Sequence, residues 1–133
     1  MISSDYRRLL LIFHSKLRLW LQPGGHIDAD DADVFAAARR EAMEETGLSG
    51  LSLEAGFPEL LDVDIHRIPP NPRKAEPSHE HFDVRIPLRA EHEAAVAGSD
   101  ALAVKWIALE RVEEIDTDES VMRAVRKLRA RCI

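Results

Sequence analysis

Residues 40–47 of the chain read Arg-Glu-Ala-Met-Glu-Glu-Thr-Gly, a stretch that sets three carboxylates close together. It completes a segment with helical periodicity that begins at Val34, and Gly47 is the residue type that often ends a helix. An aspartate before Val34, either Asp31 or Asp33, is suited to cap the first turn. The sequence therefore predicts a helix from Val34 to Thr46.

One face of this predicted helix changes from apolar to acidic along its length. Residues three and four apart share a face, and this face comprises Val34, Ala37, Ala38, Glu41 and Glu45, with Glu44 at its edge. Like charges one turn apart destabilise a helix by about 0.2–0.5 kcal/mol, and pairing of Arg40 with Glu44 relieves only part of this repulsion. A divalent cation would relieve the rest, since clustered carboxylate oxygens suit Mg²⁺ or Mn²⁺.

With Gly24 and Gly25, which follow a predicted strand, the stretch resembles the Nudix box. That motif runs Gly, five residues, Glu, seven residues, then Arg-Glu-apolar-x-Glu-Glu-x-Gly-apolar. The chain matches the second half from Arg40 to Leu48, with Ala42 small for its apolar position. The first half departs from the pattern: counted from Gly25, the expected glutamate is Asp31, and the loop is one residue longer than in the family.

The resemblance implies an α/β fold, the Nudix α/β/α sandwich with a mixed β-sheet, and the hydrolysis of a diphosphate linkage. The implied substrate is a nucleoside triphosphate or a nucleoside diphosphate derivative, and the implied cofactor is Mg²⁺, with Mn²⁺ as a substitute. The implied site residues are Glu41, Glu44 and Glu45 as metal ligands, Glu44, Glu45 and Arg40 as catalytic residues, and Gly24 and Gly25 against the substrate. Asp31 would take the place of the loop glutamate.

Elsewhere, predicted strands and helices interleave, which indicates a mixed sheet between helices in one domain over residues 1–133. Strands are predicted at 9–13, 17–22, 60–68, 82–88 and 102–108, a helical turn at 91–97, and a helix from about Thr117. Members of the family usually have a further strand before the first one predicted here. Either the sequence begins late, or the sheet lacks an N-terminal strand and a homodimer partner covers its edge.

The strands at 60–68 and 82–88 are expected to pair and to share one polar face. That face would hold Asp62, Asp64, His66, His79, His81, Asp83 and Arg85. It can be a solvated face, or it can line a substrate cleft. His66, His79 and His81 are candidates to contact substrate or a second metal, and Arg73 in the connecting loop is a candidate to contact phosphate. Trp20 and Trp106 are expected in the core rather than stacked on a base.

The composition narrows the partners of the chain. A formal net charge of −6 over 133 residues argues against nucleic acid and suits bound cations. The single cysteine, Cys132, can form no internal disulfide, which favours a cytoplasmic protein. The apolar run at 9–13 is too short for a signal peptide or a membrane span.

Two other functions stay open at this point. The altered loop is compatible with a Nudix-fold module that binds or senses a nucleotide without turnover, although such a module has no need for three mutually repelling carboxylates. The histidines could instead form a metal-binding domain. The sequence specifies neither the substrate nor the general base, for which a glutamate of the box, Glu80 and His81 are candidates.

Overall fold

The computed structural model describes residues 1–55, 60–98 and 101–132. In chain order the elements are β1 (Arg8–His14), β2 (Trp20–Leu21), α1 (Val34–Thr46), β3 (Leu51–Leu53), β4 (Asp62–Ile68), η1 (Pro72–Lys74), β5 (His79–Arg85), β6 (Leu88–Ala90), β7 (Ala101–Ala108), η2 (Leu109–Glu114) and α2 (Glu119–Cys132).

The central strand is β1, which pairs antiparallel with β2 on one side and with β7 on the other. Its residues Leu9–Ile12 are all buried. A strand covered on both faces carries a continuous apolar run instead of an alternating one. The predicted buried strand at 9–13 is therefore confirmed.

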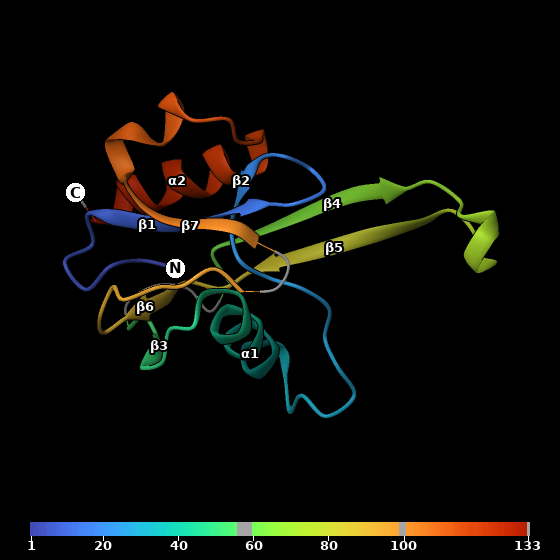
Figure 1. Ribbon diagram of the computed structural model, residues 1–133, viewed down its shortest axis with the longest axis horizontal. Coiled ribbons are helices and arrows are strands. Elements are labelled where there is room, and N and C mark those ends of the chain that lie inside the picture. Colours follow the sequence, from blue (N-terminus) through green and yellow to red (C-terminus); the bar gives the residue numbers. More distant parts are fainter. Residues whose placement is uncertain (56–59, 99–100, 133) are drawn as a thin grey trace.

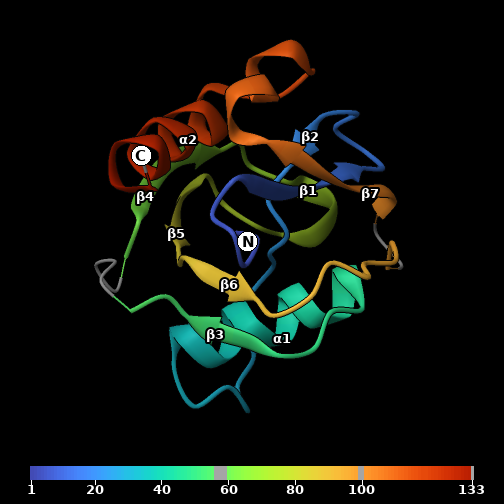
Figure 2. The same cartoon turned by 90° about the vertical axis from the view of Figure 1, so that its left-hand side faces the viewer.

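Two hydrophobic clusters lie on the two sides of this strand. Leu9 and Leu11 belong to a cluster with Val125 of α2, and Leu10 belongs to a second cluster with Ala42 of α1. Figures 1 and 2 show α2 and α1 on opposite sides of the strands. The predicted α/β/α sandwich is therefore confirmed.

Ile2 connects the two parts of the sheet. It forms an antiparallel bridge to Leu9 of β1 and a parallel bridge to Arg89 of β6, and β6 pairs antiparallel with β3. The Ile2 N–H donates to the Leu88 carbonyl at 2.8 Å. Ile2 thus joins β1 to β6, and parallel bridges at Ile2–Arg89 and Trp20–Thr117 accompany the antiparallel pairing of the named strands.

Helix α1 spans Val34–Thr46, as the sequence predicts. Asp33 is the N-cap, and its side chain accepts a hydrogen bond from the Ala36 N–H at 2.8 Å. Gly47 has a left-handed backbone with φ of 65°, and its N–H donates to the Met43 carbonyl. Of the two aspartates considered as caps, Asp33 has that role and Asp31 has another.

Strands β4 and β5 form an antiparallel hairpin that projects from the rest of the molecule (Figure 1). His66 lies opposite His81 and Asp64 lies opposite Asp83, so the predicted pairing and polar face are confirmed. Most of the alternate residues are apolar yet exposed: Phe82 is 61% exposed and Ile65 is 55% exposed. The alternation of apolar and polar residues in this hairpin therefore does not indicate that its apolar face packs against the core.

Three predicted segments were wrong in part. The second strand covers only Trp20–Leu21, because Arg18 takes a left-handed turn with φ of 59°. The strand predicted at 82–88 is divided at Pro87, which has no N–H to donate. The helical turn predicted at 91–97 does not form, since Val96 instead donates its N–H to the Thr46 carbonyl at the end of α1.

Candidate active site

The loop after β2 lies directly against the acidic face of α1. The Gly24 N–H donates to Oε2 of Glu45 at 2.9 Å. A Cβ atom on Gly25 would lie 2.5 Å from the carboxylate of Glu41, so only glycine leaves room for that carboxylate. The structure thus brings together the two glycines and two of the three glutamates that the sequence singled out.

Arg40 joins this loop to the helix. Its Nε and one terminal nitrogen donate to the two carboxylate oxygens of Asp31 at 3.0 and 2.9 Å. Its other terminal nitrogen lies 2.9 Å from Glu41 and 3.3 Å from Glu44, and the His26 carbonyl accepts a further hydrogen bond. The predicted Arg40–Glu44 pair is present, but the bidentate contact with Asp31 has the better geometry.

Asp31 fixes the shape of the loop. Its side chain is 7% exposed, and it accepts hydrogen bonds from Arg40 and from the Asp28 N–H. The hydrogen bond from Arg40 holds the pKa of Asp31 below its usual range. Although this loop is one residue longer than in the family motif, it still places a carboxylate within hydrogen-bonding distance of Arg40. A role for Asp31 as a metal ligand stays a prediction.

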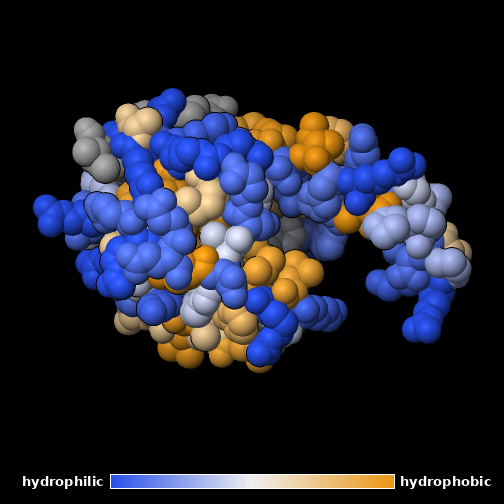
Figure 3. Space-filling model, turned by 90° about the horizontal axis from the view of Figure 1, so that it is seen from above, coloured by the Kyte–Doolittle hydropathy of each residue, from blue (hydrophilic) through white to orange (hydrophobic). Residues whose placement is uncertain are grey.

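The carboxylates of α1 differ in exposure, and that of Glu41 faces a cavity. The Glu44 side chain is 59% exposed and the Glu41 side chain is 16% exposed. Glu41 lines a cavity of about 560 Å³ together with Gly24, Gly25 and His26, and Glu80 and His81 of β5 also line it. Figure 3 shows a hollow between the outer part of the hairpin and the body of the molecule. The oxygen donors of α1 fit a hard divalent cation such as Mg²⁺.

Three other histidine side chains gather around His81. The centroid of its ring lies 5.1 Å from that of His79, 5.6 Å from that of His66 and 5.8 Å from that of His26. His26 was not predicted as a site residue from the sequence, where its signal was its place directly after Gly25. These rings link the hairpin to the glycine loop, while their contact with substrate stays a prediction.

The remaining candidates lie outside this centre. Arg73 is exposed in η1, at the far end of the hairpin from α1 (Figure 1), and its contact with phosphate stays a prediction. Trp20 packs against Phe13 with ring centroids 5.3 Å apart. Trp106 donates its indole N–H to the Glu93 carbonyl at 3.1 Å. Both tryptophans pack against the hydrophobic clusters, as predicted.

Comparisons with known proteins agree on one family. A family model described as the NUDIX domain matches residues 1–128. A probable DHNTP pyrophosphohydrolase of Lactococcus lactis is 33% identical over 88 residues, which cover 66% of this chain and 50% of that protein. The chain thus spans half the length of this relative. No helix in the described ranges is both long and apolar enough to cross a membrane.

Solved structures show the same fold. A NUDIX family hydrolase from Clostridium perfringens aligns with a TM-score of 0.74 at 19% identity, covering 97% of this chain and 91% of that one. A bifunctional NMN adenylyltransferase/ADP ribose pyrophosphatase from Francisella tularensis, complexed with AMP and a Mn ion, aligns with a TM-score of 0.59 at 17% identity. That alignment covers 99% of this chain and 40% of the other.

Proposed function

Since the chain belongs to the Nudix family, we propose that it hydrolyses a diphosphate linkage in a nucleoside triphosphate or a nucleoside diphosphate derivative, with Mg²⁺ as its cofactor. The observation that supports this proposal best is the contact between the Gly24–Gly25 loop and the carboxylates of Glu41 and Glu45. A backbone segment that a phosphate group can approach therefore lies beside carboxylates that can bind a cation.

Glu41, Glu44 and Glu45 would hold the cation. When bound, Mg²⁺ neutralises charge on the diphosphate and lowers the pKa of a water molecule. The chemistry of the donor set supports this assignment, because each residue offers carboxylate oxygens on neighbouring turns of α1. The Mn ion in the Francisella tularensis structure supports Mn²⁺ as a substitute.

The other residues of the site orient the substrate and the loop. Arg40 holds Asp31 and its loop against α1 and offsets the negative charge of Glu41 and Glu44. Gly24 leaves space for the phosphates, Gly25 lets the backbone approach the site closely, and the cavity beside Glu41 would take the remainder of the substrate. His66, His79 and Arg73 are further candidates to contact the phosphates.

The attacking water needs a general base. Glu80 and His81 line the same cavity as Glu41, which supports both as candidates for this role. We therefore keep three candidates for the base: a glutamate of α1, Glu80 and His81. A pH profile of kcat in single variants of Glu80 and His81 distinguishes them, because loss of the base removes the acid limb of the profile.

The Lactococcus lactis relative is a probable DHNTP pyrophosphohydrolase, which supports cleavage of a pyrophosphate linkage as the reaction. A second candidate function is a module that binds a nucleotide without hydrolysing it, and the lengthened loop is the observation that favours it. Against this alternative, the chain retains all three glutamates together with the arginine that orders them. The cytoplasmic location and the homodimer stay predictions.

A hydrolysis screen tests the proposal. The chain is incubated with Mg²⁺ and a panel of canonical, oxidised, sugar-linked and dinucleotide substrates, and the release of phosphate or pyrophosphate is measured. Glu45→Gln should lower kcat/KM by at least about 100-fold, since a metal ligand contributes several kcal/mol. Glu110→Gln, a matched change at an exposed glutamate in η2, should have no effect. Tight nucleotide binding without turnover on the whole panel would favour the binding module.

A further inference from the structure

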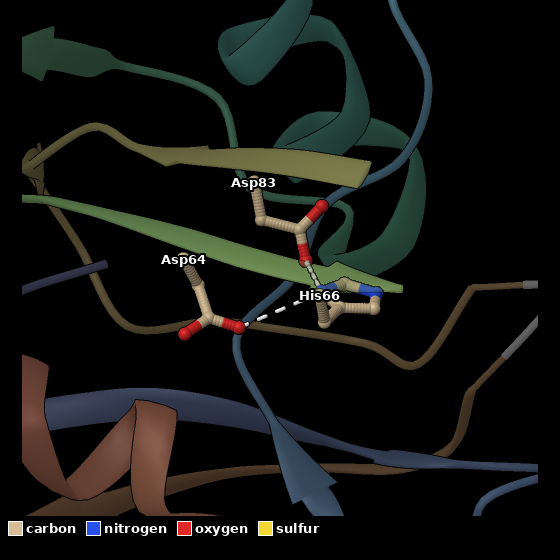
Figure 4. A group of neighbouring side chains, drawn as sticks. All are labelled: Asp64, His66 and Asp83. Carbon is tan, nitrogen blue, oxygen red and sulfur yellow. Dashed lines mark ion pairs between the residues drawn. The ribbon is translucent and has the colours of Figure 1, made fainter. Parts of the chain in front are cut away.

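The polar face of the β4–β5 hairpin holds a compact group of potential ligands. Asp64 and Asp83 lie directly opposite each other across the two strands, and His66 is the next residue on the same face of β4. One ligand atom from each of the three residues lies within 4.8 Å of the other two. Figure 4 shows the three side chains converging from the two strands.

The two distances from His66 are longer than direct hydrogen bonds and close to the spacing of ligand atoms around one ion. His66 Nδ1 lies 3.5 Å from Oδ2 of Asp64 and 3.7 Å from Oδ2 of Asp83. Hydrogen bonds of this kind span about 2.7–3.2 Å. Neighbouring ligand atoms of a tetrahedral zinc ion, with bonds of about 2.0–2.2 Å, lie roughly 3.3–3.6 Å apart.

The charges of the group also favour a cation. Carboxylates placed directly opposite each other across two strands repel. Arg123 of α2 contacts Asp64 at 2.8 Å, while the Asp83 side chain is 47% exposed and its carboxylate lies beside His66. A phosphate at His66 would meet both carboxylates, whereas a dication would balance them. Partial exposure of the three side chains leaves the position open to an ion from solvent.

The ligand types select the class of ion. One imidazole nitrogen with two carboxylate oxygens suits Zn²⁺ and related transition metals, while Mg²⁺ prefers oxygen ligands alone. His81 lies opposite His66 and meets its ring edge-on, with centroids 5.6 Å apart. We infer that Asp64, His66 and Asp83 form a transition-metal site of the zinc class on the hairpin, separate from the site on α1.

Zinc binding by the whole chain tests this inference without reference to activity. After chelator treatment, Zn²⁺ alone is added and binding is measured by equilibrium dialysis and by calorimetry. The Glu41→Gln/Glu44→Gln/Glu45→Gln variant removes the three carboxylates proposed as metal ligands on α1 and should still bind one Zn²⁺ ion. In that background, His66→Ala and Asp83→Asn should each weaken zinc binding by at least about tenfold, because both remove a ligand.

Matched variants and a spectroscopic probe complete the design. His92→Ala changes an exposed histidine away from the hairpin and should leave zinc binding unchanged. Co²⁺ bound to the hairpin should show the intense visible absorption of a tetrahedral site, and this absorption should be absent from Asp83→Asn. Circular dichroism confirms that each variant is folded. Zinc affinity that is equal within twofold in the His66→Ala and parent proteins would overturn the inference, as would binding of inorganic phosphate in place of zinc.

Discussion

The backbone N–H of Gly24 donates a 2.9 Å hydrogen bond to the carboxylate of Glu45, across 21 positions of the chain. This bond attaches the loop after β2 to the last turns of α1. The next residue, Gly25, lies so close to Glu41 that a side chain would displace the carboxylate. The loop therefore controls where the metal ligands of the proposed site point.

Gly25→Ala should weaken activation by Mg²⁺ while leaving the fold intact. The added Cβ would lie 2.5 Å from the Glu41 carboxylate, and the flexible end of that side chain can move away. Disturbing the orientation of a metal ligand typically costs about 10–100-fold in metal affinity. We expect a Mg²⁺ titration of the hydrolysis rate to shift by at least about tenfold, with the free energy of unfolding changed by less than about 1 kcal/mol.

Gly24→Ala is the matched control for this prediction. A Cβ atom on Gly24 would meet nothing within 4 Å, and alanine keeps the N–H that bonds to Glu45. Its Mg²⁺ titration should shift less than that of Gly25→Ala. Equal shifts in the two variants would contradict the role given to the Gly25–Glu41 contact.

Gly98→Ala should destabilise the protein through the backbone of α1. A Cβ atom on Gly98 would lie 2.3 Å from the Glu44 carbonyl oxygen and 2.8 Å from Cα of Glu45. A helix backbone cannot move aside as a flexible side chain can, so we expect a loss of about 1–3 kcal/mol. Urea unfolding measures this loss. Val96→Ala, at a side chain that is 71% exposed, should change stability by less than about 0.5 kcal/mol.

The sequence predicted α1 well because its signals are local. The capping aspartate, the apolar face and Gly47 all lie within the helix or beside it, so spacing alone identified Val34–Thr46. The polar face shared by β4 and β5 was predicted for a similar reason, since alternation in two neighbouring strands fixes which residues share a face. Metal ligands on α1 could be proposed from the same periodicity.

The parts that the sequence did not reveal depend on contacts between distant segments. Asp31 reaches Arg40 only because the intervening loop folds back, and spacing in the sequence does not encode that path. The ring of His26 approaches that of His81 for the same reason. The segment 91–97 lost its predicted helical turn because the N–H groups of Val96 and of Gly98 just after it donate to the last carbonyls of α1 instead.

Arg40→Lys should lower both stability and activity although it keeps the positive charge. The single ammonium nitrogen of lysine cannot reproduce the two parallel hydrogen bonds that the planar guanidinium of Arg40 donates to Asp31. Losing charge-assisted hydrogen bonds at a partly exposed site costs about 1–2 kcal/mol. We expect a matching drop in unfolding free energy and a fall in kcat/KM of about tenfold or more, because the loop that bears Gly24 and Gly25 loosens.

Arg39→Lys is the matched control, since Arg39 is the preceding residue of α1 and is exposed. Its stability and its kcat/KM should both stay at the parent values. If Arg40→Lys were as stable and as active as Arg39→Lys, the bidentate contact with Asp31 would not organise the site.

A buried aspartate ties the base of the hairpin to α2. The Asp62 side chain is 4% exposed and contacts Arg85 at 3.1 Å, Arg123 at 2.6 Å and Lys127 at 2.7 Å. Burial raises the pKa of Asp62, but the hydrogen bonds from Arg123 and Lys127 outweigh that effect and hold the pKa well below its usual range. Protonation of Asp62 is therefore coupled to unfolding.

Asp62→Asn should remove stability at neutral pH and flatten the acid branch of the stability curve. The unfolded state takes up a proton near pH 4 and the folded state only at lower pH, so the contribution of Asp62 is complete above about pH 4 and declines as the pH falls further. Removing one partner of a buried ion pair costs about 3 kcal/mol. Urea unfolding at pH 7 and at pH 3 should show a difference between parent and variant that is smaller at pH 3. Asp30→Asn, at an exposed loop residue, should match the parent at both values, and a difference for Asp62→Asn that does not change with pH would contradict the coupling.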